Sequence, residues 1–134
     1  MASPTTLGRV HHVQRIMTLA EVNANTRAGT TIVPGLSGRR LKVVDCWMRA
    51  LTGNAGGATA VIITDTVPTT VVSQTIAALT AGAVVRMGGS GSTCTNAGTI
   101  LGEGAGLRVG CTVADLTTCS GGLEVDVDYV ICTE

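Results

Sequence analysis

Hydrophobic and polar side chains alternate with the period of a β-strand over most of the chain after residue 30. Clusters of Gly, Pro, Asn and Ser interrupt this alternation at spacings of roughly 8 to 12 residues, as in antiparallel sandwiches and small barrels. The pattern therefore predicts an all-β fold, an antiparallel β-sandwich or jelly roll of about seven to nine strands. The strands expected after residue 30 cover residues 30–33, 41–51, 58–67, 71–76, 83–87, 99–102, 107–113 and 123–131.

The two longest of these strands differ in the composition of their faces. Residues 41–51 carry hydrophobic side chains at both odd and even positions, which predicts a strand that is covered on each side, or covered once by its own sheet and once by a neighbour. Residues 123–131 alternate cleanly, with Glu124, Asp126 and Asp128 on one face and apolar side chains on the other. We interpret the three acidic residues as a solvated or salt-bridged face rather than as paired catalytic carboxylates.

The first 30 residues do not show the regular alternation of the later segments. Residues 1–9 are small and polar, and the β-branched side chains within residues 10–17 favour a strand over a helix. Thr18 and Glu21 have the spacing of a capping box, which predicts a single helical turn that ends near Asn25. We expect an extended N-terminal arm over residues 1–15 and a single β-sandwich domain over residues 16–134, with at most one short helical turn.

Composition narrows the functional classes. The 134 residues include nine Lys or Arg and nine Asp or Glu, so the formal net charge is zero, and only 13% of the residues are charged. The lack of a basic surplus argues against nucleic acid as a partner. No hydrophobic run approaches the roughly 18 residues that a membrane span needs. Because so few charges solvate a lone domain poorly, we expect this one to associate with itself or with a larger body.

The sequence offers little for catalysis or for a cofactor. His11 and His12 are the only histidines, and neighbouring side chains on a strand point to opposite faces, so the two cannot readily share a metal ion. No Cys-x-x-Cys pair is present to complete a zinc site. A histidine in an arm is also poorly placed for a hydrolase triad. We therefore expect a non-enzymatic protein without a metal ion or a cofactor.

The five cysteines fit no zinc or redox signature. Cys46, Cys111 and Cys132 fall within predicted strands, where a cysteine behaves as a small buried hydrophobic residue. Cys94 and Cys119 fall in loops rich in Gly, Ser and Thr, and they are the one pair that we consider for a disulfide. The N-terminal residues lack the pattern of an export signal, so we expect folding to begin in a reducing compartment.

Two groups of basic residues are candidates for contact with a partner. They are Arg39 and Arg40 before the strand at 41–51, and Arg9, His11, His12 and Arg15 along the predicted arm. The first group reads either as a solvated loop and strand edge or as a docking point for an acidic partner or a neighbouring subunit. Arginine suits docking because its guanidinium group forms bidentate pairs with carboxylates.

Several short motifs resemble those of small structural proteins of tailed bacteriophages. A Thr-x-x-Glu turn within residues 16–22 precedes a Val-Pro corner and a Lys-Val-Val-Asp strand within residues 31–45. The strand within residues 79–85 and the Asp-Val-Asp-Tyr-Val sequence at residues 126–130 continue the likeness, which covers most of the chain loosely. The five cysteines and the histidine pair depart from it.

This resemblance implies a β-sandwich or jelly-roll decoration protein, also called a cement protein, on the outside of a capsid. Such proteins are commonly trimers seated where several major capsid subunits meet. The expected partners are therefore the major capsid protein and further copies of this chain, and the expected location is the virion surface after synthesis in the host cytoplasm. The alternative is a tail-fibre or head-fibre module that binds a receptor glycan. Glycan sites usually offer exposed aromatic rings, and this chain has only Trp47 and Tyr129.

Overall fold

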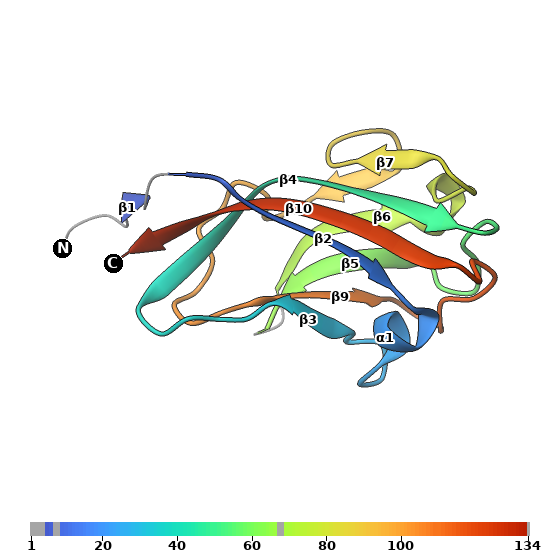
Figure 1. Ribbon diagram of the computed structural model, residues 1–134, viewed down its shortest axis with the longest axis horizontal. Helices are drawn as coiled ribbons and strands as arrows, with labels where there is room; N and C mark the ends of the chain where they lie inside the picture. The colour runs from blue at the N-terminus through green and yellow to red at the C-terminus, as the bar shows by residue number, and fades with distance from the viewer. Residues whose placement is uncertain (1–4, 7–8, 67–68, 134) are drawn as a thin grey trace.

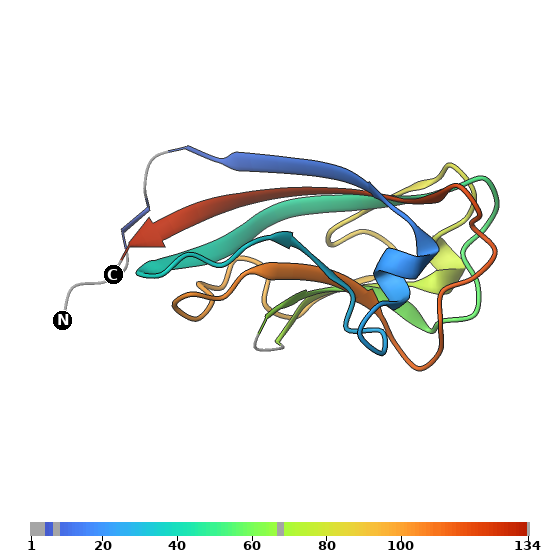
Figure 2. The same cartoon turned by 60° about the horizontal axis from the view of Figure 1, so that its bottom comes forward.

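The computed structural model describes residues 5–6, 9–66 and 69–133, which form two antiparallel sheets packed face to face (Figures 1 and 2). Sheet A contains β1 (Thr5–Thr6), β2 (His11–Met17), β4 (Arg39–Leu51), β7 (Val84–Arg86) and β10 (Gly122–Thr133). Sheet B contains β3 (Thr30–Val33), β5 (Ala60–Asp65), β6 (Thr70–Thr75), β8 (Ser92–Cys94) and β9 (Leu107–Cys111). The predicted all-β sandwich is confirmed.

The two longest strands, β4 and β10, form the centre of sheet A. β10 pairs with β4 along one side and with β1 and β2 along the other, and β7 pairs with the second half of β4. Sheet B has the order β3-β9-β5-β6-β8. Strands that are distant in sequence are therefore neighbours in both sheets, and most of the fold depends on long-range pairing.

A β-bulge in sheet A explains why residues 41–51 are hydrophobic at both odd and even positions. Asp128 pairs with Asp45, whereas the next residue of β10 pairs with Val43. Val44 is therefore an extra residue on β4, and such an insertion shifts the alternation of side chains by one position. The core side chains of β4 are Leu41 and Val43 before the bulge and Cys46, Met48 and Ala50 after it. The core thus covers one face of β4, while the other face is only partly covered within this chain, and its cover by a neighbour stays a prediction.

The helix α1 (Leu19–Asn23) closes one end of the sandwich between the two sheets (Figure 2). The predicted capping box is present, because Thr18 Oγ1 accepts from the Glu21 N–H at 3.1 Å while the Glu21 carboxylate accepts from the Thr18 N–H at 3.0 Å. Asn23 then holds the helix against a distant loop. Its side-chain amide donates to the Leu116 carbonyl at 3.0 Å and accepts from the Leu116 N–H at 2.7 Å. Elsewhere in the described ranges the helical structure is one 3-10 turn, η1 (Ile76–Ala78).

Two predictions about sheet edges need correction. Residues 92–94, expected in a loop, form β8 and pair with β6 at the edge of sheet B. Residues 99–102, expected as a strand, are irregular. The segment 98–104 nevertheless follows β4, through N–H groups of residues 98, 101 and 104 that donate to the carbonyls of residues 43, 41 and 39. Successive donors are three positions apart along the chain, whereas successive acceptors are two positions apart, so a regular ladder cannot form.

The boundary of the predicted arm also needs correction. Residues 1–4 and 7–8 lie outside the described residues. Residues 11–15, placed in the arm by the sequence, belong to β2, which pairs with β10 from Leu123 to Tyr129. The N-terminal segment is thus part of sheet A from His11 onward, and the predicted strand at residues 10–17 is the better description.

The core between the sheets is built from aliphatic and methionine side chains, since the chain has no Phe. Its largest fully buried hydrophobic members are Met17, Leu41, Met48, Ile63, Leu79, Leu107, Leu116 and Leu123. Gln74 is also fully buried, with Nε2 3.4 Å from the Val85 carbonyl and Oε1 without a hydrogen-bond partner. None of the helices in the described part of the chain has the length and apolar character to cross a membrane.

Asn23→Ala tests the clamp between α1 and the distant loop. We expect the free energy of unfolding to fall by about 1–3 kcal/mol, because the Leu116 N–H and carbonyl lose their partners in a half-buried position. Urea unfolding followed by circular dichroism measures the change. Gln14→Ala, which truncates an exposed amide, is the control and should change stability by less than about 0.5 kcal/mol. Equal effects of the two substitutions would contradict this role of Asn23.

Candidate functional site

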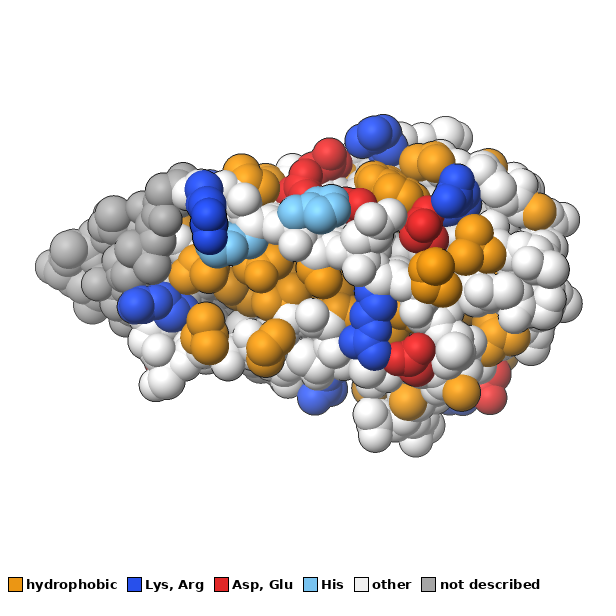
Figure 3. Space-filling model, in the orientation of Figure 1, with side chains coloured by type: hydrophobic (Ala, Val, Ile, Leu, Met, Phe, Trp, Pro, Cys, Tyr) orange, Lys and Arg blue, Asp and Glu red, His pale blue; other side chains and the backbone are white. Residues whose placement is uncertain are grey.

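The outward side of sheet A carries charged side chains from four neighbouring strands. Strand register places its side chains in three rows across the sheet. The first row is Ile16, Glu124, Arg49 and Val84, the second is Gln14, Asp126, Trp47 and Arg86, and the third is His12, Asp128 and Asp45. We call these residues the sheet A face. Figure 3 views the molecule from this side and shows acidic, basic and histidine side chains next to hydrophobic ones.

The first two rows combine an ion pair with large apolar side chains. Arg49 Nη2 lies 2.6 Å from Glu124 Oε1, and the guanidinium carbon lies 6.0 Å from the ring centroid of Trp47. Ile16 and Val84 flank this pair and are 59% and 48% exposed. The first row therefore has an ion pair at its centre and an exposed apolar side chain at each end.

His12 joins the second and third rows. Its Nε2 lies 3.1 Å from Asp126 Oδ2 and its Nδ1 lies 2.6 Å from Asp128 Oδ1, so both ring nitrogens face carboxylate oxygens. Only these three described residues form a group of potential metal ligands, with ligand atoms within 4.8 Å of one another. Asp45 lies across the strand pair from Asp128 and makes a further ion pair with Arg86 at 3.5 Å.

Electrostatics shift the protonation equilibria of this cluster. The hydrogen bond to the Asp128 carboxylate raises the pKa of His12 above its ordinary value, and the charges of Asp126 and Asp128 act in the same direction against the effect of desolvation. Burial raises the pKa of Asp126, and the negative charges of Asp128, Asp45 and Glu124 add to that effect, while His12 opposes it. The prediction of a salt-bridged acidic face on the last strand is thereby confirmed.

Besides His12, two of the residues predicted to contact a partner are engaged within the chain. Arg15 bonds the Glu21 carboxylate at 2.5 Å and the Thr31 carbonyl at 3.3 Å, so it ties β2 of sheet A to β3 of sheet B. His11 stacks on Tyr129 with ring centroids 5.4 Å apart, on the opposite side of the sheet from His12. The prediction that the two histidines point to opposite faces is confirmed.

The remaining predicted arginines lie at the start of two strands. Arg9 is exposed just before β2 and Arg39 is exposed at the first position of β4, and neither makes an ion pair with a described residue. Arg40 is half-buried. None of the three belongs to the sheet A face, and their contact with a partner stays a prediction.

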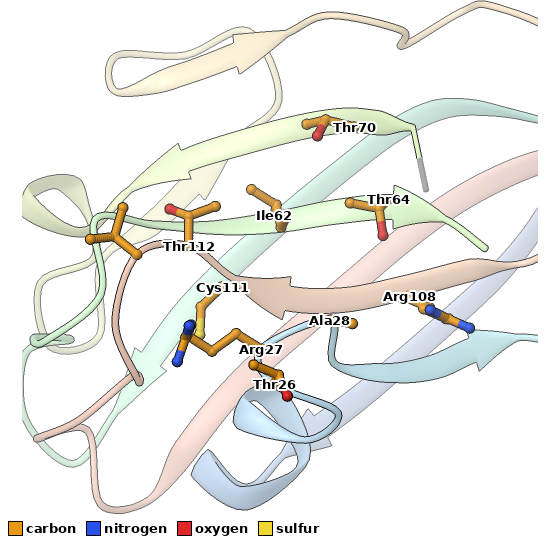
Figure 4. Close-up of a pocket in the computed structure, with 10 residues that line it drawn as sticks. Thr26, Arg27, Ala28, Ile62, Thr64, Thr70, Arg108, Cys111 and Thr112 are labelled. Atoms are coloured by element: carbon orange, nitrogen blue, oxygen red, sulfur yellow. The ribbon is translucent and has the colours of Figure 1, made fainter. Parts of the chain in front are cut away.

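A pocket of about 430 Å³ opens on the outer side of sheet B (Figure 4). Its lining residues are Thr26, Arg27, Ala28, Ile62, Thr64, Thr70, Arg108, Cys111, Thr112 and Val113. Figure 4 shows Arg27 and Arg108 at opposite ends of the pocket, so their guanidinium groups do not converge on one point. The lining contains no carboxylate and no imidazole. The pocket therefore offers hydroxyl and guanidinium donors but no evident general acid or base.

The disulfide considered between Cys94 and Cys119 is not formed. Cys94 is an exposed free thiol in β8, and Cys119 is a fully buried free thiol. Cys46, Cys111 and Cys132 are buried as predicted. Burial raises the pKa of Cys46 to about 12, and it also raises the pKa values of Cys111 and Cys119.

Sequence reasoning did not find Ile16, Trp47, Arg49 and Val84 as parts of one face. The alternation of residues 123–131 did reveal the acidic members of that face. The bulge at Val44 concealed its β4 members, because the alternation changes phase within the strand. With that phase known, the basic and aromatic residues of β4 fall opposite the acidic residues of β10.

The chain is thus an all-β sandwich with an ion-paired outer face on one sheet and an open pocket on the other. Comparisons with protein-family models, with curated proteins and with solved structures gave no match. The chemistry of the molecule is accordingly read from its own side chains: the sheet A face can dock a partner or hold a cation, and the pocket can donate hydrogen bonds.

The protonation of His12 can be measured directly by NMR titration in the presence of a chelator. We expect the pKa of His12 to lie above the ordinary value of 6.5. Asp128→Asn should lower this pKa, because it removes the hydrogen bond to the Asp128 carboxylate that raises it most. A histidine whose pKa is raised on folding stabilises the fold fully below the unfolded value, and this contribution disappears as the pH rises through the folded value. An unchanged pKa in the Asp128→Asn variant would contradict the geometry of the cluster.

Thiol titration tests the distribution of the cysteines. In the native protein Cys94 should react rapidly with an aromatic disulfide reagent, whereas the other four should react only after unfolding, because their side chains are buried. Cys94→Ser should abolish the rapid phase. Any number of rapidly reacting thiols other than one per chain in the native, reduced protein would contradict this distribution.

Proposed function

We propose that the chain is a non-enzymatic structural protein of a virus particle that binds the outside of the capsid and bridges major capsid subunits. The motifs within residues 31–45 and at residues 126–130 resemble those of phage decoration proteins, and the β-sandwich is compatible with that resemblance. Its activity is adhesion, because each bound copy adds contacts that exist only in the assembled shell and so raises the stability of the shell. In this proposal the chain is seated as a homotrimer where several subunits meet.

The observation that carries the proposal is the composition of the sheet A face. Trp47 and Arg49 belong to the residue types that dominate binding energy at interfaces, and they lie near its centre. Exposed Ile16 and Val84 provide apolar margins. Because Arg49 is already paired with Glu124, a partner can cover this region without leaving an isolated buried charge.

Exposed apolar surface elsewhere on the molecule supports the same proposal. Outside the sheet A face, large hydrophobic side chains are exposed at Val10, Leu36 and Ile100 in a chain with only 13% charged residues. Figure 3 shows further hydrophobic side chains along the side of the molecule where β2 lies. β2 is an edge strand of sheet A, so the backbone groups on its free side can pair with an extended segment of a partner.

The double variant Ile16→Glu and Val84→Glu tests the sheet A face. We expect it to bind expanded empty shells of the major capsid protein encoded with this chain at least about tenfold more weakly than the unmodified protein. The reason is that two charges would be buried without partners. Co-sedimentation with the shells measures binding. Val113→Glu is the matched control, since this valine is 78% exposed beside the pocket on the other sheet, and it should bind like the unmodified protein.

Two results would overturn this proposal. One is equal binding of the double variant and the Val113→Glu control, which would remove the sheet A face from the interface. The other is a monodisperse monomer at high concentration by light scattering, together with no binding to shells. Circular dichroism of each variant establishes that a loss of binding is not a loss of fold.

A second candidate function is a fibre module that binds a receptor glycan, and the pocket on sheet B is the observation that favours it. Threonine hydroxyls and the guanidinium group of Arg108 can donate hydrogen bonds to sugar oxygens. No aromatic ring lines the pocket, so the usual stacking on a sugar face is missing. Glycan-array binding that is lost in Arg108→Ala and retained in the Ile16→Glu and Val84→Glu variant would favour this function over capsid binding.

A further inference from the structure

We propose that His12, Asp126 and Asp128 form a binding site for a divalent transition-metal ion, with Zn²⁺ as the best-fitting member of that class. The proposal does not depend on the capsid function. It follows from the position of an imidazole between two carboxylates on adjacent strands of sheet A. The sequence alone argued against a metal site because His11 and His12 diverge, and it did not bring His12 to the acidic residues of the last strand.

The three ligands project from two paired strands. His12 lies directly opposite Asp128 in the β2–β10 pair, and Asp126 lies two residues along on the same face. The three ligand atoms are within 4.8 Å of one another. Bond lengths of about 2.1 Å in a tetrahedral zinc site place ligand atoms roughly 3.4 Å apart. A metal ion would bind one ring nitrogen of His12 together with both carboxylates, so the imidazole would give up one of its two present carboxylate contacts.

The geometry of His12 calls for a cation between the strands. A neutral imidazole has one N–H and one lone pair, so it can donate to only one of the two carboxylates that it faces. The other carboxylate would then meet the lone pair of the second nitrogen. Either a second proton on the ring or a metal ion beside it removes this conflict.

The surrounding charges match a divalent ion. Four carboxylates, those of Asp45, Glu124, Asp126 and Asp128, face two guanidinium groups, those of Arg49 and Arg86. With a neutral imidazole, this part of the face carries a surplus of two negative charges. The Asp126 side chain is only 9% exposed, so its carboxylate is poorly solvated and gains more from a bound cation than a surface carboxylate would.

The donor set selects the class of metal. One imidazole nitrogen with two carboxylates suits Zn²⁺ and neighbouring transition metals, whereas Mg²⁺ and Ca²⁺ prefer oxygen ligands alone. Three protein ligands leave at least one coordination position open. His12 is 53% exposed, so this position is accessible to water or to a carboxylate or imidazole from a docked partner.

Calorimetric titration with ZnCl₂ tests the site in tag-free protein at a pH above 7.5. Every variant carries Cys94→Ser, because the exposed thiol would otherwise bind zinc by itself. We expect one zinc ion per chain, with affinity lowered at least about tenfold by His12→Gln, Asp126→Asn or Asp128→Asn. His11→Gln is the matched control, since it removes the neighbouring imidazole from the opposite side of the sheet, and it should bind zinc like the parent protein.

A second measurement uses the parent protein, in which the histidines and aspartates are intact, so its result does not depend on whether a variant folds. Addition of paramagnetic Co²⁺ should broaden the NMR signals of the His12 ring before those of His11. The proposal is overturned if the parent protein gives no saturable zinc binding, if His12→Gln binds as tightly as His11→Gln, or if Co²⁺ broadens both histidines alike. Binding to capsid shells in the presence of EDTA reports separately on the capsid function, so the two proposals can fail independently.

Discussion

The antiparallel pairing of β4 with β10 is the constraint on which the rest of this molecule depends. The two strands pair along their whole length, and the bulge at Val44 changes which side chains of β4 face the core. If Val44 were instead paired as a regular ladder residue, the side chains on one side of it would exchange faces: either Asp45 would turn toward the core or Leu41 and Val43 would turn outward. The bulge therefore keeps a continuous apolar core on one side of sheet A and gathers charged side chains on the other.

The carboxylates among these charges need ion-pair partners on the same face of the sheet. Glu124 and Asp126 are 9% and 6% exposed although they lie on the outward side of the sheet, and a poorly solvated carboxylate is costly without a partner. Arg49 supplies one partner from β4, and His12 supplies the other from β2. The same arrangement that stabilises the fold thus provides the side chains on which both proposals rest, the docking surface and the cation site.

The two outer surfaces of the sandwich differ in chemistry. The sheet A face is ion-paired, contains the only Trp and has apolar margins, whereas the pocket on sheet B is lined mainly by Thr, Arg and small side chains. A protein that bridges subunits of a shell can use the first surface for attachment and leave the second toward the exterior. The lining of the pocket contains neither a carboxylate nor an imidazole.

The sequence by itself determined the features that are encoded locally: the β-period of the strands, the turns between them, the capping box of Thr18 and Glu21, and the acidic face of the last strand. Tertiary structure decided the rest, because each remaining feature depends on register between distant segments. The phase change at Val44 is invisible where both faces of a strand are apolar, and the irregular path of residues 98–104 is set by the edge of β4. His12 and Asp128 are 116 residues apart in the chain, and only the pairing of β2 with β10 brings them together.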